Sequence, residues 1–321
     1  MKRIAFSLLA MCGLAGIAVA AVNDPPPPWA FPVNPGGESS GAENPNKVER
    51  VDGSNVTYTD AQTDSHYLSL DWFPKEHPAP PTIVATGHQA QKIWACSVCH
   101  DVTGQGGSES AALTGLPASY IIEQVKEFRS GRRKAAEPKM IPPHGMEGEA
   151  RTVSDADVKA AAAYFSQLVF KPRIHVIETD VAPKATAQSV GIMAKAPGGG
   201  TEPLGHRIVE IPDDIRNWEL SNTHMQYFAY VPKGSIARGA ALVASGNGAA
   251  PCATCHGAGL RGTATAPPLA GRSPSYIVRQ LYDIQYGTRR GPTVELMLPE
   301  VARITADDRI AIAAYIASLK P

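Results

Sequence analysis

The chain has 321 residues, which is enough for two domains of ordinary size. Hydrophobic residues make up 43% and charged residues only 19%, so packed cores are expected. Lysine plus arginine and aspartate plus glutamate both number 30, and this balance excludes the basic field that nucleic-acid binding needs. With 29 glycines, 28 prolines and 7% aromatic residues, the composition favours helices separated by long loops over a large all-β protein.

The first 20 residues have the pattern of an export signal. Lys2 and Arg3 precede a short apolar run at 4–17, and Ala-Val-Ala at 18–20 fits the small-x-small rule for cleavage. The run is too short for a comfortable transmembrane helix, and no other stretch approaches 18 apolar residues. We therefore predict that residues 1–20 are removed and that the protein is periplasmic. Retention of the run as a membrane anchor is the alternative.

Residues 21–78 form a proline-rich extension. Four consecutive prolines occupy positions 25–28, and a Gly-Gly pair follows at 36–37. Because proline holds the backbone extended, this composition predicts an arm that runs over the surface of the molecule.

Four of the five cysteines form two copies of one motif, and the fifth, Cys12, lies in the export signal. The motif is C-x-x-C-H, and its residues are Cys96, Cys99 and His100 in the first copy and Cys252, Cys255 and His256 in the second. This is the attachment motif of c-type haem. Thiols one helical turn apart can bond the two vinyl groups of a porphyrin, and the histidine that follows then lies beneath the iron.

Other uses of paired cysteines fit this pattern less well. A C-x-x-C disulfide is strained and reducible, which suits a redox pair better than a structural crosslink. Zinc ribbons place their cysteine pairs about 15–20 residues apart, whereas these pairs are 156 residues apart. Neither alternative explains the histidine after both pairs. We therefore predict two covalently bound haem c groups.

The same shift of 156 residues carries further residues with it, so the chain contains an internal duplication. It places Ser119 on Ser275, Tyr120 on Tyr276, Gln124 on Gln280, Gly131 on Gly287 and Arg133 on Arg289. Apolar residues at helical spacing follow each serine, which predicts a helix with the serine as N-cap and the glycine at its C-terminal end.

Two further helices are expected in each copy. One is short, precedes the cysteine pair and ends near Gly87 or Gly246. The other closes the copy and begins at Ser154 or Thr305, because acidic residues follow each of these in the first turn. Each copy is thus predicted as helix, C-x-x-C-H, loop, helix, methionine loop, helix.

The segment between the copies, residues 171–234, is long for a linker. Stretches at 173–178, 207–211 and 227–231 have the pattern of short strands, and Pro-Gly-Gly-Gly at 197–200 divides them. We predict an irregular, short-β connecting segment that braces the two copies or meets a partner.

On these motifs each copy resembles a class I cytochrome c domain, and the chain resembles the two-domain diheme cytochromes c. The shared residues are C-x-x-C-H at 96–100 and 252–256, Gly-x-x-x-Ser-Tyr-Ile at 115–121 and 271–277, and Gly-x-Arg at 131–133 and 287–289. The resemblance covers roughly 80–170 and 235–321 and implies a mainly α fold. The expected domains are haem domains at 79–170 and 235–321, joined by the connecting segment.

The resemblance also implies a methionine, from the loop before the last helix, as the sixth iron ligand. Met297 is the candidate in the second copy, 18 residues before Tyr315. In the first copy Met146 is 18 residues before Tyr164 and is favoured, because the register of the loop should follow the helix it leads into. Met140 is the alternative, since it lies near the position of Met297 when the copies are aligned through the earlier helix.

The predicted iron ligands are therefore His100 with Met146 for haem 1 and His256 with Met297 for haem 2. His144 is a weaker alternative to methionine in the first copy. Thioether ligation raises the haem potential relative to two imidazoles. A filled coordination sphere leaves no open position for a substrate, which favours an electron carrier over an enzyme.

Two sequence features near the motifs are asymmetric or ambiguous. In the family a proline carbonyl holds the axial histidine ring, and Pro267-Pro268 fits that role, whereas the first copy has Ala111-Ala112.

Basic residues recur after the glycines of both copies, and they can neutralise haem propionates, dock a partner or simply be solvated. These residues are Arg132, Arg133, Lys134, Arg289 and Arg290.

The sequence thus predicts an exported diheme electron-transfer protein with no catalytic residue. Its partners would be redox proteins: a dehydrogenase or quinol-oxidising complex as donor and a cytochrome or oxidase as acceptor. One alternative is a diheme cytochrome c peroxidase, which needs one haem with a free sixth position. The other is the haem subunit of a membrane-bound dehydrogenase, where membrane association comes from partners.

Overall fold

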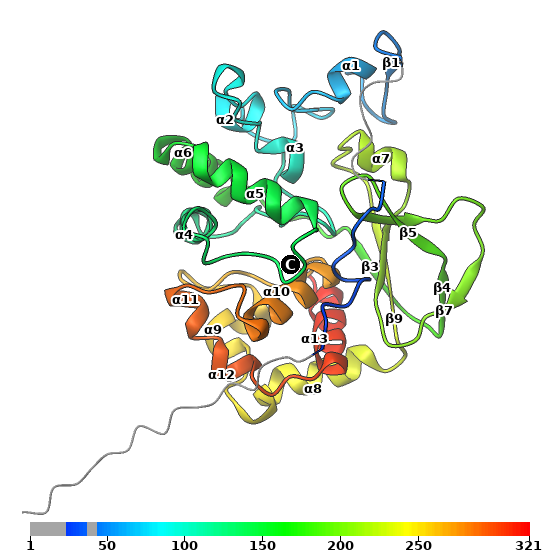
Figure 1. Ribbon diagram of the computed structural model, residues 1–321, viewed down its shortest axis with the longest axis vertical. Helices are drawn as coiled ribbons and strands as arrows, with labels where there is room; N and C mark the ends of the chain where they lie inside the picture. Colours follow the sequence, from blue (N-terminus) through cyan, green and yellow to red (C-terminus); the bar gives the residue numbers. More distant parts are fainter. Residues whose placement is uncertain (1–23, 37–43) are drawn as a thin grey trace, which may run out of the picture.

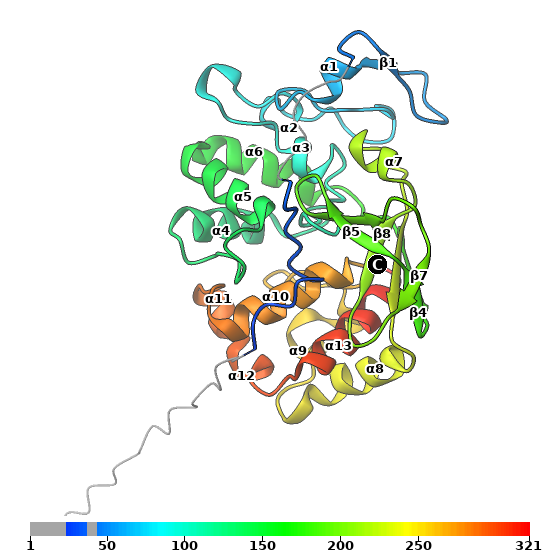
Figure 2. The same cartoon turned by 45° about the vertical axis from the view of Figure 1, so that its right-hand side comes forward.

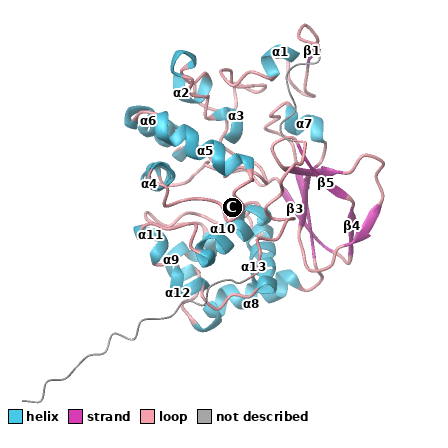
Figure 3. Ribbon diagram, in the orientation of Figure 1, coloured by secondary structure: helices cyan, strands magenta, loops and turns pink. Residues whose placement is uncertain are grey.

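The computed structural model describes residues 24–36 and 44–321. The predicted export signal and its cleavage site lie outside the described residues. Figure 1 shows two stacked helical bodies with a layer of strands along one side of both, and Figure 3 separates the two kinds of element by colour. Within the described ranges, no helix combines the length and the apolar character needed to cross a bilayer.

The first helical body contains the first C-x-x-C-H motif. Its helices are α2 (Thr82–Ala85), α3 (Ser97–His100), α4 (Ala118–Arg129), α5 (Ile141–Thr152) and α6 (Asp155–Ser166). A core that includes Ile83, Ile121 and Phe165 holds them together. The predicted start of the last helix is confirmed, because the Ser154 side chain caps α6 by accepting a hydrogen bond from the Asp157 backbone N–H.

The second helical body repeats this arrangement around the second motif. Its helices are α8 (Ser235–Ser245), α9 (Ala253–His256), α10 (Pro274–Tyr286), α11 (Pro292–Glu295), α12 (Leu298–Val301) and α13 (Ala306–Ser318). Thr305 caps α13 in a reciprocal capping box with Asp308, as the acidic first turn predicted. The short helix before each motif is also confirmed: Gly87 follows α2, and Gly246 is the left-handed C-cap of α8.

The predicted N-caps of the two long helices are wrong by two residues. The cap of α10 is Ser273, whose Oγ accepts from the Tyr276 N–H at 3.1 Å, and α4 begins after Pro117. Proline explains the displacement, because its fixed φ suits the first helical turn, as Pro274 shows in α10. Ser119 and Ser275 therefore lie inside their helices.

The three strands predicted in the connecting segment form one sheet. Strands β3 (Ile174–Glu178), β9 (Tyr227–Val231) and β8 (Val209–Pro212) pair in that order, β3 parallel and β8 antiparallel to β9. Figure 2 shows this sheet beside α10 and α13. The connecting segment thus packs against the second helical body as well as joining the two.

Other elements of the connecting segment were not predicted. Strands β4 (Val181–Pro183) and β7 (Thr201–Pro203) form one ribbon, and β5 (Ala185–Gln188) and β6 (Ile192–Lys195) form a second. Helix α7 (Ile215–Glu219) follows β8. Elements this short carry too few residues for a recognisable period, so tertiary contacts decide their conformation.

The N-terminal extension does more than run over the surface. Strands β1 (Val48–Glu49) and β2 (Tyr58–Thr59) pair, and α1 (Asp60–Thr63) follows them. Phe31 is 2% exposed and packs in the core of the second helical body, and Trp72 donates from Nε1 to the Leu220 carbonyl at 2.6 Å. The prediction of a surface arm is wrong at these positions, because buried aromatic side chains anchor the extension.

Helices α8 and α13 approach so closely that Gly239 has no room for a side chain. A Cβ at this position would lie 2.0 Å from the Ala311 carbonyl oxygen and 2.7 Å from the Tyr315 Cβ. We expect Gly239→Ala to destabilise the protein by about 1–3 kcal/mol, as overpacked cores do, even though alanine is worth about 1 kcal/mol more than glycine within a helix. Urea unfolding measures the change.

The matched control is Gly148→Ala in α5, where a Cβ would meet nothing within 4 Å. Here the gain in helix propensity is unopposed, so this variant should be stabilised by about 0.4–1 kcal/mol. Equal effects of the two substitutions would contradict the close helix contact.

Candidate functional site

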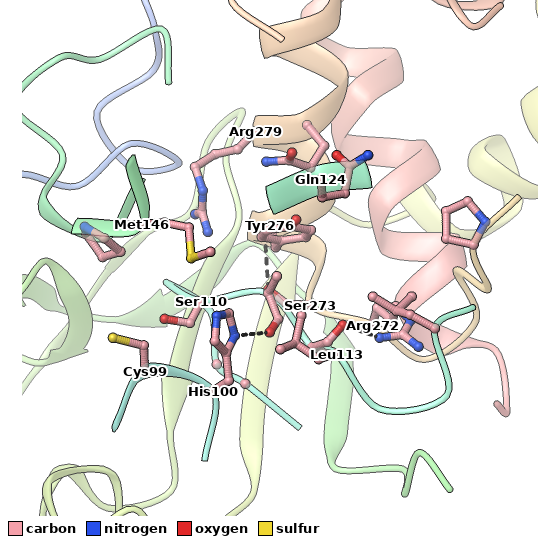
Figure 4. A pocket seen from close by; sticks show the side chains of 18 of the residues that line it. Cys99, His100, Ser110, Leu113, Gln124, Met146, Arg272, Ser273, Tyr276 and Arg279 are labelled. Carbon is pink, nitrogen blue, oxygen red and sulfur yellow. Dashed lines mark hydrogen bonds between the residues drawn. The ribbon is translucent and has the colours of Figure 1, made fainter. Parts of the chain in front are cut away.

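Both C-x-x-C-H motifs open into one cavity of about 1070 Å³. Its lining combines residues of both helical bodies, the N-terminal extension and the connecting segment. Figure 4 shows the wall around the first motif, where His100 and Met146 lie toward side chains of α10 such as Tyr276. The duplicated sequence therefore folds so that its two copies present their motifs to a shared interior.

The first motif is a single helical turn that presents an oriented imidazole. Helix α3 ends at His100, and His100 Nδ1 lies 2.8 Å from the Ala111 carbonyl oxygen. This hydrogen bond leaves Nε2 as the lone-pair nitrogen, the form that ligates a metal. Burial lowers the pKa of His100, which keeps the ring neutral, and burial raises the pKa of the Cys96 thiol to about 12.

The second motif has the same geometry. His256 Nδ1 lies 2.9 Å from the Pro267 carbonyl oxygen, and burial lowers the pKa of this ring as well. Ala111 occupies the position equivalent to Pro267, and its carbonyl makes the equivalent contact. The missing proline of the first copy therefore does not remove the acceptor, because the interaction uses backbone atoms only.

The structure places the two candidate methionines of the first copy in different surroundings. Met146 lines the cavity, and Figure 4 shows its sulfur pointing into it. Met140 is 1% exposed and packs in the core of the second helical body, outside the cavity lining. His144 is exposed and likewise lies outside the lining.

Met146 lies in helix α5, so the prediction that it comes from a loop is wrong. Pro142 and Pro143 occupy the first turn of α5, where the missing N–H groups cost nothing, and the helix continues past them. Met297 lies between α11 and α12, as the N-cap of α12, and lines the cavity. Within each copy, one histidine and one methionine thus lie on the wall of the same cavity, while His66 and Met225 line it from the N-terminal extension and the connecting segment.

These side chains fit a covalently attached haem. Two thiols one turn apart, an imidazole with its second nitrogen already bonded, and a thioether form the donor set of a six-coordinate c-type haem. The cavity is at the upper end of the range for ligand sites, as two porphyrins require.

Two arginines of the duplicated set connect the copies across the cavity. Arg133 donates to the Tyr276 hydroxyl at 2.8 Å, and Arg289 donates to the Tyr120 hydroxyl at 2.7 Å. Each guanidinium also bonds to both glutamines of the set, Gln124 and Gln280.

Both arginines are only 7% exposed, so solvation and partner docking are wrong as interpretations of these two. Arg132 and Arg290 remain exposed. The residues that the shift of 156 relates include every member of this network. Sequence reasoning nevertheless missed that bonds run between the copies.

The contact between the copies contains a buried carboxyl, Asp283, that makes the folding stability of the protein depend on pH. Asp283 of α10 accepts a hydrogen bond from the Ala136 backbone N–H at 2.8 Å, and burial raises the pKa of Asp283 from 3.8 to about 6. Between these values the folded chain holds a proton that the unfolded chain has lost. The stability from this proton is complete below pH 3.8 and is lost as the pH rises through about 6.

We therefore expect Asp283→Asn to be more stable than the parent above pH 6, by up to about 3 kcal/mol, because the amide never ionises. Below pH 4 the two proteins should unfold at similar urea concentrations. Urea unfolding from pH 3.5 to 8 measures this, and a constant difference across that range would contradict the assignment to Asp283.

Comparison with known proteins identifies the family of both copies. The family model described as cytochrome c matches residues 87–168 and again residues 236–320. The chain is 28% identical over 227 residues to a thiosulfate dehydrogenase electron acceptor of Thiomonas intermedia (strain K12), which covers 70% of this chain and 78% of that protein. It is 25% identical over 232 residues to cytochrome c4 of Pseudomonas aeruginosa, covering 71% and 85%.

Solved structures show similar matches. A thiosulfate dehydrogenase of Marichromatium purpuratum aligns with a TM-score of 0.47 and 28% identity, covering 73% of this chain. This chain spans only 38% of that longer protein. Reduced cytochrome c4 of Pseudomonas stutzeri aligns with a TM-score of 0.46 and 21% identity, covering 72% of this chain and 98% of the other.

Proposed function

The chain belongs to the cytochrome c family, with one family domain at residues 87–168 and a second at 236–320, and on that premise we propose that it is an exported electron carrier. It is a diheme electron-transfer cytochrome with two covalently bound haem c groups. In the proposed role it accepts electrons from a dehydrogenase or quinol-oxidising complex and passes them to a downstream cytochrome or oxidase. The observation that carries the proposal is one histidine and one methionine per copy on a single cavity wall.

The proposed sites use the residues that line the cavity. For haem 1, Cys96 and Cys99 form the thioethers and His100 and Met146 ligate the iron; for haem 2, the same roles fall to Cys252, Cys255, His256 and Met297. The iron of each bound haem supplies one-electron redox chemistry between the ferric and ferrous states. We propose haem domains at 79–170 and 235–321, with the connecting segment bracing them.

The chain's own groups hold both axial ligands in place. The Ala111 and Pro267 carbonyls orient the two imidazoles, and α5 and the α11–α12 turn bring Met146 and Met297 to the cavity. A sulfur on the wall in each copy favours six-coordinate iron at both positions, and this supports a carrier over a peroxidase, which needs one open position.

The names of two relatives support a dehydrogenase as donor. The proteins of Thiomonas intermedia and Stutzerimonas stutzeri are named as electron acceptors of thiosulfate dehydrogenase, at 28% and 29% identity. In a stopped-flow experiment, oxidised protein mixed with that dehydrogenase and thiosulfate should be reduced at both haems, and an oxidised monohaem cytochrome c added next should reoxidise them. Peroxide turnover together with a high-spin haem band would instead favour the peroxidase alternative.

The proposal includes export to the periplasm. Cleavage after Ala20 would make Ala21 the first residue of the mature protein. Cell fractionation with N-terminal sequencing tests this step. Full-length protein in the membrane fraction, beginning at Met1, would contradict it and favour an uncleaved anchor.

A further inference from the structure

The connecting segment contributes two buried polar side chains to the cavity wall beside the first motif. Arg173 precedes β3 and Tyr227 begins β9, and the Tyr227 N–H donates to the Arg173 carbonyl at 2.8 Å. Arg173 is 4% exposed and Tyr227 is 1% exposed, and both line the cavity together with His100 and Asp101. Residues 171–234 lie outside both regions that the family model matches.

The polar ends of these two side chains make no hydrogen bond, although Arg173 forms a loose ion pair with Asp101. Both Nη atoms of Arg173 and the hydroxyl of Tyr227 have no hydrogen-bond partner among the described residues. The guanidinium lies over the Tyr227 ring, 5.2 Å from its centroid, and the Asp101 Oδ2 atom is 3.7 Å from Nη1. A buried arginine with open donors is costly, so these donors call for an acceptor in the cavity.

The neighbouring charged groups are already engaged. Arg272 donates to the Ala112 and Thr114 carbonyls, and Arg279 donates to those of Ala30 and Ser108. Burial raises the pKa of Glu109 and of Glu210, which weakens both as charged partners for Arg173.

A guanidinium and a phenol that both offer hydrogen-bond donors are best matched by an anion that accepts at more than one oxygen. A carboxylate accepts at both oxygens, and its plane matches the two Nη donors of arginine. We propose that Arg173 and Tyr227 bind an anionic carboxylate at the edge of haem 1, and that a haem propionate provides it. The connecting segment then adjusts the potential of haem 1.

This inference rests on the proposed placement of haem 1 between His100 and Met146. A positive charge beside the porphyrin stabilises the ferrous form relative to the more positive ferric form, so it raises the potential. Removal of the Arg173 charge should therefore make haem 1 easier to oxidise and leave haem 2 unchanged.

The test is spectropotentiometric titration of the full-length holoprotein and three variants. Arg173→Gln keeps an amide donor but removes the charge. It should lower the equilibrium constant for reduction of one haem at least tenfold, which lowers the midpoint potential by about 59 mV for one electron. Tyr227→Phe, which removes only the hydroxyl, should lower the same equilibrium constant at least twofold and so shift the same potential in the same direction. The matched control is Arg207→Gln, since Arg207 pairs with Glu202 at 2.7 Å outside the cavity lining and should change neither potential.

The outcomes separate this inference from the proposed function. If Arg173→Gln and Tyr227→Phe keep two low-spin haems but titrate like the parent, the inference is wrong and the carrier function stands. If the potential of the parent follows added phosphate, and Arg173→Gln abolishes that response, the site holds a free anion and the propionate assignment fails. Should Arg173→Gln not fold, the Tyr227→Phe shift and the resonance Raman bending band of the propionates decide the question.

Discussion

Replacing Met146 with alanine is expected to open the iron of haem 1. The substitution removes the proposed sulfur ligand from the cavity wall and leaves His100 as the axial ligand of that iron. The sulfur–iron absorption band of haem 1 should disappear, and the ferrous iron should bind carbon monoxide. Its potential should fall on the order of 0.1 V, within the roughly 0.8 V over which axial ligands tune haem iron. Optical spectra with redox titration measure all three changes.

Met140→Ala is the matched control. Met140 is 1% exposed in the core of the second helical body, so its truncation should cost about 2–5 kcal/mol of stability. It should leave both sulfur–iron bands intact. Loss of the band in Met140→Ala, with retention in Met146→Ala, would reverse the assignment, and retention in both would exclude both residues as ligands.

Replacing Arg133 or Arg289 with methionine is expected to weaken the contact between the two haem domains. Each substitution leaves a partly buried tyrosine hydroxyl, that of Tyr276 or Tyr120, without its charged donor. A hydrogen bond to a charged group is worth about 1.5–3 kcal/mol, and each arginine makes more than one such bond, so we expect about 3 kcal/mol per variant. Calorimetry should then resolve separate unfolding of the domains.

The double variant tests whether the two arginines act as one network. Because both guanidinium groups bond to Gln124 and Gln280, their effects should not add, and the coupling should be about 0.5–3 kcal/mol. Arg290→Met is the control, because the side chain of this exposed neighbour donates to the Gly287 carbonyl of its own domain and lies outside the shared network. Strict additivity would mean that the two sites stabilise the protein independently.

Features with a local chemical cause could be predicted from sequence. The spacing of Cys96, Cys99 and His100 follows from the porphyrin edge, and Ser154 caps α6 through an atom three residues away. The strands at β3, β8 and β9 were recognisable because each carries an apolar pattern of its own. In these cases the determining contacts lie within a few residues of one another.

Features that depend on distant contacts could not be predicted. Arg173 and Tyr227 meet only because β3 pairs with β9, and nothing near either residue marks it as part of a cavity wall. The duplication contained Arg133 and Tyr276, but a repeat does not say whether bonds form within a copy or between copies. Met140 and Met146 differ by six positions, and packing against the other domain separates their surroundings.

The central claim is that two irons are attached to this chain and that protein side chains occupy both axial positions of each. A pyridine haemochrome assay with intact mass, followed by carbon monoxide titration of the reduced protein, tests it most directly. We predict two haems per chain and no carbon monoxide complex at either iron. A colourless product from a host that matures c-type cytochromes, or ready carbon monoxide binding at both irons, would contradict it.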